Sequence, residues 1–96
     1  MNEPDQGPVK AEIERKLSDA LSPMLLRVVD ESALHAGHHG HRPGKETHFR
    51  VEVVSAAFTG LSRLARHRRV NELLARELAE GVHALSIDAK TPAEAQ

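Results

Sequence analysis

The chain has 96 residues, of which 13 are Lys or Arg and 14 are Asp or Glu, so its formal net charge at pH 7 is −1. A chain of this length forms one domain, and the balanced charge gives no indication of bulk attraction to nucleic acid or anionic lipid. Cysteine is absent, which excludes disulfides, thiol catalysis and any metal site built on this chain's own thiolates. The seven His residues are the unusual feature of the composition.

The ends of the chain and its hydropathy predict a cytoplasmic protein. Residues 1–7 are polar, and they have neither the apolar run of a secretory signal nor the Arg-rich character of a transit peptide. No segment approaches the about 20 apolar residues that span a bilayer, so we expect no membrane partner. We expect a single domain over 8–92, with flexible ends at 1–7 and 93–96.

The first half of the chain predicts a helix and two strands. Apolar residues recur every four positions after Pro8, which suits the first turn of a helix, and Pro23 ends that helix. The apolar, β-branched segment 25–31 predicts a strand, and 47–55 alternates as a half-buried strand does. Residues 33–45 between them are interpreted as a loop rich in Gly and His.

The second half predicts a helix over 62–80 and a last strand over 82–89. The expected apolar face of this helix consists mainly of Leu61, Leu64, Ala65, Leu74 and Leu78. The order α–β–β–α–β predicts an α+β fold, in which the first two strands form an antiparallel hairpin and the third lies parallel to the second after a right-handed crossover. We therefore expect a three-stranded mixed sheet with both helices on one face.

Histidine gathers in the predicted loop. The residues are His35, His38, His39 and His41. Imidazole is a common transition-metal ligand, so the spacing suits metal contact or a pH-responsive loop, whereas a solvated loop that tolerates His is the alternative. His83 falls inside the predicted last strand, on the face of Leu85 and Ile87, where a hydrogen bond at the sheet edge or a rigidly held ligand would explain it. His48 alternates outward and is interpreted as a surface residue.

One dense basic cluster lies near the start of the second predicted helix. It consists of Arg63, Arg66, His67, Arg68 and Arg69. Positive side chains oppose the partial positive charge of a helix start unless an anion or an acidic partner lies opposite, which indicates a binding surface. The alternative is a solvated face neutralised by Glu72 and Glu77. A turn followed by a basic helix also suggests a DNA recognition helix, although the balanced charge weighs against it.

The sequence contains no catalytic set of residues. None of its Ser residues lies in a nucleophile elbow, and there is no Gly-rich phosphate loop. Three strands leave little room for an active-site cleft. We therefore expect a binding protein and not an enzyme.

Several segments, by their order and spacing, resemble the BolA family. They are Asp30-Glu31-Ser32 before the His loop, Glu46 to Ser55, Phe58 to Ser62, Arg66 to Arg68, and Gly81 to Ile87. The resemblance covers about Val9 to Pro92. It implies an α–β–β–α–β fold that is similar to the type II KH fold without its Gly-x-x-Gly clamp.

The resemblance also implies a function. BolA-like proteins bind monothiol glutaredoxins and share a 2Fe–2S cluster with them, in iron–sulfur cluster trafficking or iron regulation. Some bacterial members are described as transcription regulators of stress response and morphology, with DNA contacts in a helix-turn-helix-like region. That alternative would use the basic cluster.

The family's ligands imply the roles of particular His residues. The His of the family's Gly-Val-His-Ala-Leu motif binds the cluster, which implies that role for His83. The second ligand comes from the loop, which implies His35, with His38, His39 and His41 as alternates. A glutaredoxin Cys and glutathione would complete the set. We therefore expect no cofactor in the isolated chain, which would be a monomer or a weak homodimer.

Overall fold

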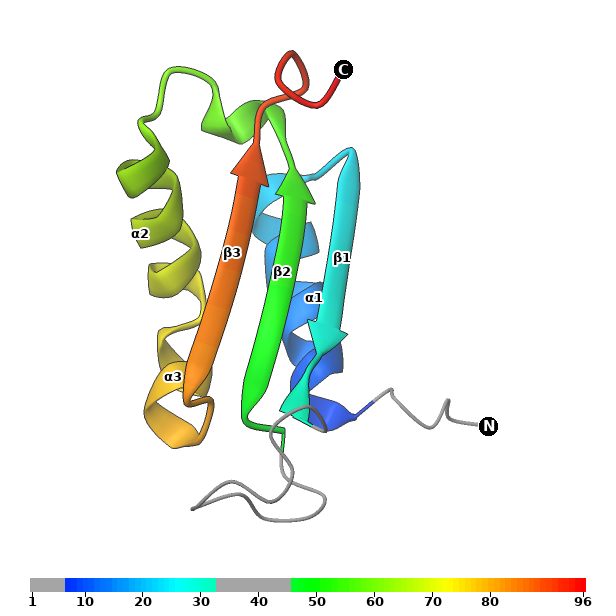
Figure 1. Ribbon diagram of the computed structural model, residues 1–96, viewed down its shortest axis with the longest axis vertical. Coiled ribbons are helices and arrows are strands. Elements are labelled where there is room, and N and C mark those ends of the chain that lie inside the picture. Colours follow the sequence, from blue (N-terminus) through cyan, green and yellow to red (C-terminus); the bar gives the residue numbers. More distant parts are fainter. Residues whose placement is uncertain (1–6, 33–45) are drawn as a thin grey trace.

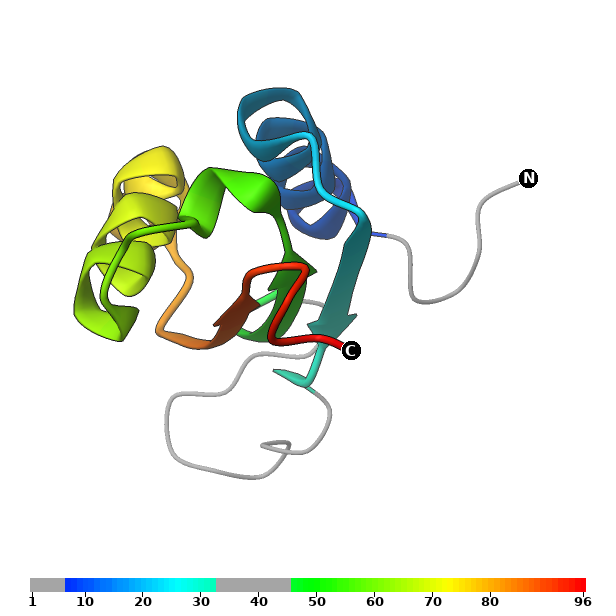
Figure 2. The same cartoon turned by 90° about the horizontal axis from the view of Figure 1, so that it is seen from above.

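The computed structural model describes residues 7–32 and 46–96, which form two layers. A three-stranded sheet makes one layer, and the helices cover one of its faces (Figures 1 and 2). The elements are α1 (Pro8–Leu21), β1 (Leu25–Asp30), β2 (His48–Val54), the 3-10 turn η2 (Ala56–Phe58), α2 (Arg63–Leu73), α3 (Ala75–Glu80) and β3 (Ala84–Lys90).

The sheet has the predicted topology. Its order is β1-β2-β3, with β1 antiparallel to β2 and β3 parallel to β2. Val51 in the central strand pairs with Val28 on one side and with Ile87 on the other. Because β2 and β3 run in the same direction, both strands begin at the same end of the sheet, at the bottom of Figure 1.

The core lies between the sheet and the helices, as the hydrophobic pattern predicts. On β2 the alternating residues Phe49, Val51 and Val53 are almost completely buried. The four-residue stripe of α1 buries its Ile13 and Leu17 against them in the same cluster. The period-2 strand and the helical stripe therefore each bury one face, as a two-layer domain requires.

The prediction of one helix over 62–80 is wrong in two respects. This segment forms two helices, α2 and α3, which are separated at Leu74. Leu64, expected on the apolar face, is 59% exposed, whereas Val70 and Leu74 are buried. At 3.6 residues per turn, Leu64 lies about 120° around the helix axis from Val70, so the two side chains cannot both face the core. No Gly or Pro marks the break, and we attribute it to the packing of Leu74 in the core.

Candidate metal-ligand site

The starts of β2 and β3 place His48 and His83 at the same end of the sheet. His48 is the first residue of β2, and His83 immediately precedes β3. The backbone N–H groups of His83 and Ala84 both donate to the Thr47 carbonyl, at 2.8 and 3.2 Å. These bonds hold the backbone of His83 beside Thr47, the residue that precedes His48.

His83 does not lie where alternation along the last strand predicts. The strand begins at Ala84, and His83 is exposed, while Val82 is buried. The Val82 N–H donates to the Glu77 carbonyl at 3.0 Å, and Val82 lies between the end of α3 at Glu80 and the start of β3 at Ala84. His83 therefore lies just before the regular alternation of β3 begins.

The imidazoles of His48 and His83 are neighbours. Their ring centroids are 6.3 Å apart, and the ring planes are inclined by 22°. The Thr47 hydroxyl lies 2.8 Å from Nδ1 of His48. Alternation predicts that His48 faces away from the core, and its half-buried position agrees with this. The neighbouring ring was missed because it depends on the register between β2 and β3.

The four loop residues predicted as ligands or alternates, His35, His38, His39 and His41, lie outside the described residues. The described residues on either side of that segment are bonded to each other. Ser32 Oγ donates to Asp30 at 2.5 Å and accepts from the Thr47 N–H at 2.9 Å. The end of β1 is thereby tied to the start of β2, at the end of the sheet where His83 lies.

The described residues offer few metal ligands. Within 7–32 and 46–96, no group of three or more His, Cys, Asp or Glu is placed to hold a metal ion. His48 and His83 alone supply at most two nitrogens, whereas a tetrahedral iron or zinc site needs four ligands. A metal at this position therefore needs donors from the rest of the chain or from another molecule.

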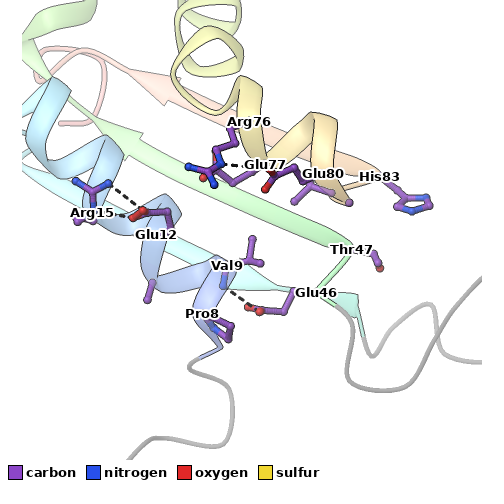
Figure 3. A pocket seen from close by; sticks show the side chains of 13 residues that line it. Pro8, Val9, Glu12, Arg15, Glu46, Thr47, Arg76, Glu77, Glu80 and His83 are labelled. Atoms are coloured by element: carbon purple, nitrogen blue, oxygen red, sulfur yellow. Dashed lines mark hydrogen bonds and ion pairs between the residues drawn. The ribbon is translucent and has the colours of Figure 1, made fainter.

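A groove of about 1010 Å³ adjoins His83, between the first turns of α1 and the helix α3 (Figure 3). Four of its charged side chains form two ion pairs, Arg15 with Glu12 at 2.7 Å and Arg76 with Glu80 at 3.3 Å. The hydrogen bond from Arg15 lowers the pKa of Glu12. The paired charges of this groove indicate no particular charged ligand.

Glu46 forms one wall of the groove and caps α1. Its carboxylate accepts the backbone N–H groups of Val9 and Lys10, each at 3.0 Å. The residue before the helix, Gly7, provides no side-chain cap. The negative charge also complements the positive end of the helix dipole. Sequence patterns could not predict this cap, because capping signals are local and Glu46 is 37 residues away from Val9.

The predicted basic cluster divides into two kinds of residue. Arg66 is 12% exposed, and its guanidinium binds Glu94 at 2.6 and 3.1 Å and the Ala89 carbonyl at 3.1 Å. Arg66 therefore joins α2 to the turn that follows β3, within the segment where composition alone predicts a flexible end. His67 is half-buried, while Arg63, Arg68 and Arg69 are exposed and make no side-chain ion pair with a described residue.

The contact between Arg66 and Glu94 predicts a pH dependence of the C-terminal turn. The Arg66 guanidinium and then the Thr91 N–H lower the pKa of Glu94 to about 2. A depressed carboxyl pKa stabilises the folded state above the ordinary value near 4.3, and that contribution is lost as pH falls toward the folded value. We expect the Thr91 amide, which donates to Glu94, to stay protected from hydrogen exchange at pH 4. Glu94→Gln should reduce that protection at pH 4 and above, and equal protection in both proteins would contradict the expected contact.

No helix within the two described ranges is long and apolar enough to cross a membrane.

Comparisons with known proteins identify relatives of the whole fold. A family model described as BolA-like protein matches residues 17–94. BolA-like protein 1 of Homo sapiens is 56% identical over 88 residues, which are 92% of this chain and 61% of the relative. A protein of Vibrio cholerae, named DNA-binding transcriptional regulator BolA, is 49% identical over 84 residues, covering 88% of this chain and 76% of that protein.

A solved structure confirms the fold. The BolA domain of SufE1 from Arabidopsis thaliana matches with a TM-score of 0.83 and 49% sequence identity, over 93% of this chain and 98% of that one. The mixed sheet and the helices on its one face are therefore those of a BolA structure. The chain spans only 61% of the length of its human relative, so the activity of that whole protein does not transfer directly.

Proposed function

Because this chain belongs to the family of BolA-like proteins, we propose that it partners a monothiol glutaredoxin and shares a 2Fe–2S cluster with it, in iron–sulfur cluster trafficking or iron regulation. The observation that carries the proposal is the exposed imidazole of His83 beside the start of β2, held by the backbone bond to Thr47. The protein acts as a binding module and not as an enzyme.

The donor set fits a shared cluster. The chain has no thiol, so it supplies imidazole only, and the thiolates come from a glutaredoxin Cys and from glutathione. Replacing thiolate by neutral imidazole raises the reduction potential of a 2Fe–2S cluster, as in Rieske centres. The exposure of His83 lets a second protein approach the ring without displacing the core.

His83→Ala should abolish the shared cluster. The protein is mixed anaerobically with a monothiol glutaredoxin, glutathione, iron and sulfide, and the complex is followed by visible circular dichroism and gel filtration. The wild type should give a heterodimer with its own visible spectrum, which the variant loses because one iron ligand is gone. An unchanged spectrum would contradict the ligand assignment. His67→Ala, on α2, is the matched control and should retain the wild-type spectrum.

DNA binding is a second candidate. It is supported by the three exposed arginines of the basic cluster, Arg63, Arg68 and Arg69, and by the printed name of the Vibrio cholerae relative. Phosphate contacts make affinity fall with salt, by a slope of about 0.9 per contact in a double-logarithmic plot. Arg68→Glu should therefore weaken duplex binding and lower that slope by about 1. Arg27→Glu, on the sheet, should leave both unchanged, and an absence of binding at moderate salt would reject this candidate.

A further inference from the structure

The two edges of the sheet differ in how they are covered. Along β3 lies α2, and the Arg66 guanidinium donates to the Ala89 carbonyl at 3.1 Å (Figure 1). At the other edge, β1 is hydrogen-bonded to β2 and to no further strand among the described residues. Leu25, at the start of β1, is 50% exposed. An open strand edge of this kind is a template for pairing with another strand.

We propose that β1 is the contact surface for a second copy of this chain. The two copies of β1 pair antiparallel about a two-fold axis at Val29, so that one continuous sheet runs through both chains. The interface is isologous, because each copy contributes the same strand. It lies at the edge of the sheet away from β3, and it requires neither a metal nor a glutaredoxin.

The backbone of β1 is suited to this pairing. The Glu31 N–H donates to the His48 carbonyl at 2.8 Å, which continues the ladder between β1 and β2. Alternate residues of an antiparallel strand bond to the same neighbour, so the N–H and C=O groups of Leu26, Val28 and Asp30 point away from β2. An antiparallel second copy presents complementary donors and acceptors to these groups.

Charge selects the register of the two copies. Arg27 and Glu31, the residue after β1 ends, each form an ion pair with β2 and lie on the sheet face away from the helices. With the two-fold axis at Arg27, the two arginines would lie directly opposite each other, which is destabilising. With the axis at Val28, Arg27 would lie opposite Val29, and no charges would meet. With the axis at Val29, Arg27 lies opposite Glu31 of the second copy, and this favourable contact occurs twice.

The helical layer leaves the edge of β1 accessible. Figure 2 shows α1 over a face of the sheet and not across the β1 edge. Because the axis is perpendicular to the sheet, both copies have their helices on the same face. We expect a single pair of strands to bury less than the roughly 1,200 Å² of a stable interface. The dimer is therefore weak and forms at high micromolar protein concentration.

A single cysteine reports the contact, because the chain has no cysteine of its own. At the axis the two copies of residue 29 form a non-hydrogen-bonded pair, whose Cα atoms are about 4.5 Å apart and within disulfide range. Val29→Cys should therefore give a disulfide-linked dimer under mild oxidation. Ser86→Cys, at an exposed position of β3, is the control and should remain monomeric. Arg27→Cys should cross-link more slowly than Val29→Cys, because residue 27 lies two positions from the axis.

Sedimentation equilibrium of two Glu variants provides an independent measurement. Val29 and Ser86 both pair in register with Arg50, one from each side of the central strand. Each new carboxylate therefore has the same neighbour within its own chain, but only Val29→Glu places two like charges opposite each other at the axis. Val29→Glu should raise the dimer dissociation constant by at least about tenfold, whereas Ser86→Glu should leave it unchanged. Far-ultraviolet circular dichroism establishes that each variant is folded.

The outcomes separate this inference from the proposed function. A wild type that remains monomeric at high micromolar concentration would overturn the inference, as would equal effects of Val29→Glu and Ser86→Glu. Cross-linking of Ser86→Cys or Arg27→Cys that is as fast as that of Val29→Cys would overturn it too. The cluster-bearing complex does not depend on this contact, so the proposed function stands if the dimer is absent. The dimer likewise stands if no cluster is shared with a glutaredoxin.

Discussion

Phe49→Ala should lower the free energy of unfolding by about 3–5 kcal/mol, the range for a buried aromatic truncated to Ala. Phe49 is 2% exposed, lies on the central strand and is one of only two aromatic residues in the chain. Domains of this size have a total stability of roughly 5–15 kcal/mol, so the variant should unfold at much lower denaturant concentration. The chain has no Trp or Tyr, and unfolding is therefore followed by far-ultraviolet circular dichroism in urea.

Two variants control for volume and for position. Phe49→Leu keeps most of the apolar volume and should cost less than about 1.5 kcal/mol. Leu64→Ala removes a side chain that is 59% exposed and should change the stability by no more than about 0.5 kcal/mol. A cost below 1 kcal/mol for Phe49→Ala, together with an unchanged m-value, would contradict the packed core between sheet and helices.

Local patterns predicted the first half of the fold because its elements bury regular faces. Pro8 begins α1, and the stripe through Ile13, Leu17 and Leu21 is buried. The alternation on β2 places Phe49 in the core in the same way. Where burial follows one period along an unbroken element, the sequence contains enough information to assign both the element and its buried face.

The second half depends on contacts that periodicity does not contain. The break at Leu74 has no local breaker, and the buried face of α2 is set by its packing on the sheet. Leu64 was therefore assigned to the wrong face. The contact from Arg66 to Glu94 joins residues 28 positions apart and is likewise invisible to local patterns. Tertiary packing overrides propensity at such positions.

The candidate site was predictable only in part. His83 was identified through the family resemblance, whereas its exposure and its place before β3 follow from the turn after α3. The neighbouring ring of His48 follows from strand register, which one sequence does not determine when the strands are joined by a helical crossover. Thr47 and His48 lie beside His83 because the parallel strands β2 and β3 begin at the same end of the sheet.

Removal of Lys16 from its ion pair with Glu77 should cause the second large loss of stability. Lys16 Nζ lies 3.0 and 2.8 Å from the two carboxylate oxygens of Glu77, which joins α1 to α3. The side chains are only 23% and 9% exposed. Lys16→Ala leaves the carboxylate buried without its partner, and fully buried pairs lose 3–5 kcal/mol in this way. Because Lys16 keeps some contact with water, we expect a smaller loss of about 1–3 kcal/mol.

The double variant distinguishes the cost of an unpaired charge from the value of the pair. Lys16→Met with Glu77→Leu removes both charges and keeps apolar volume, and such replacements are often neutral or stabilising. We therefore expect the double variant to regain most of the stability that Lys16→Ala loses, in urea unfolding at pH 7. The loss should also persist at high salt, because buried pairs are screened less than exposed ones. A loss below about 0.5 kcal/mol, as for an ordinary surface substitution, would mean that water solvates Glu77 and that the pair does not hold α3 against α1.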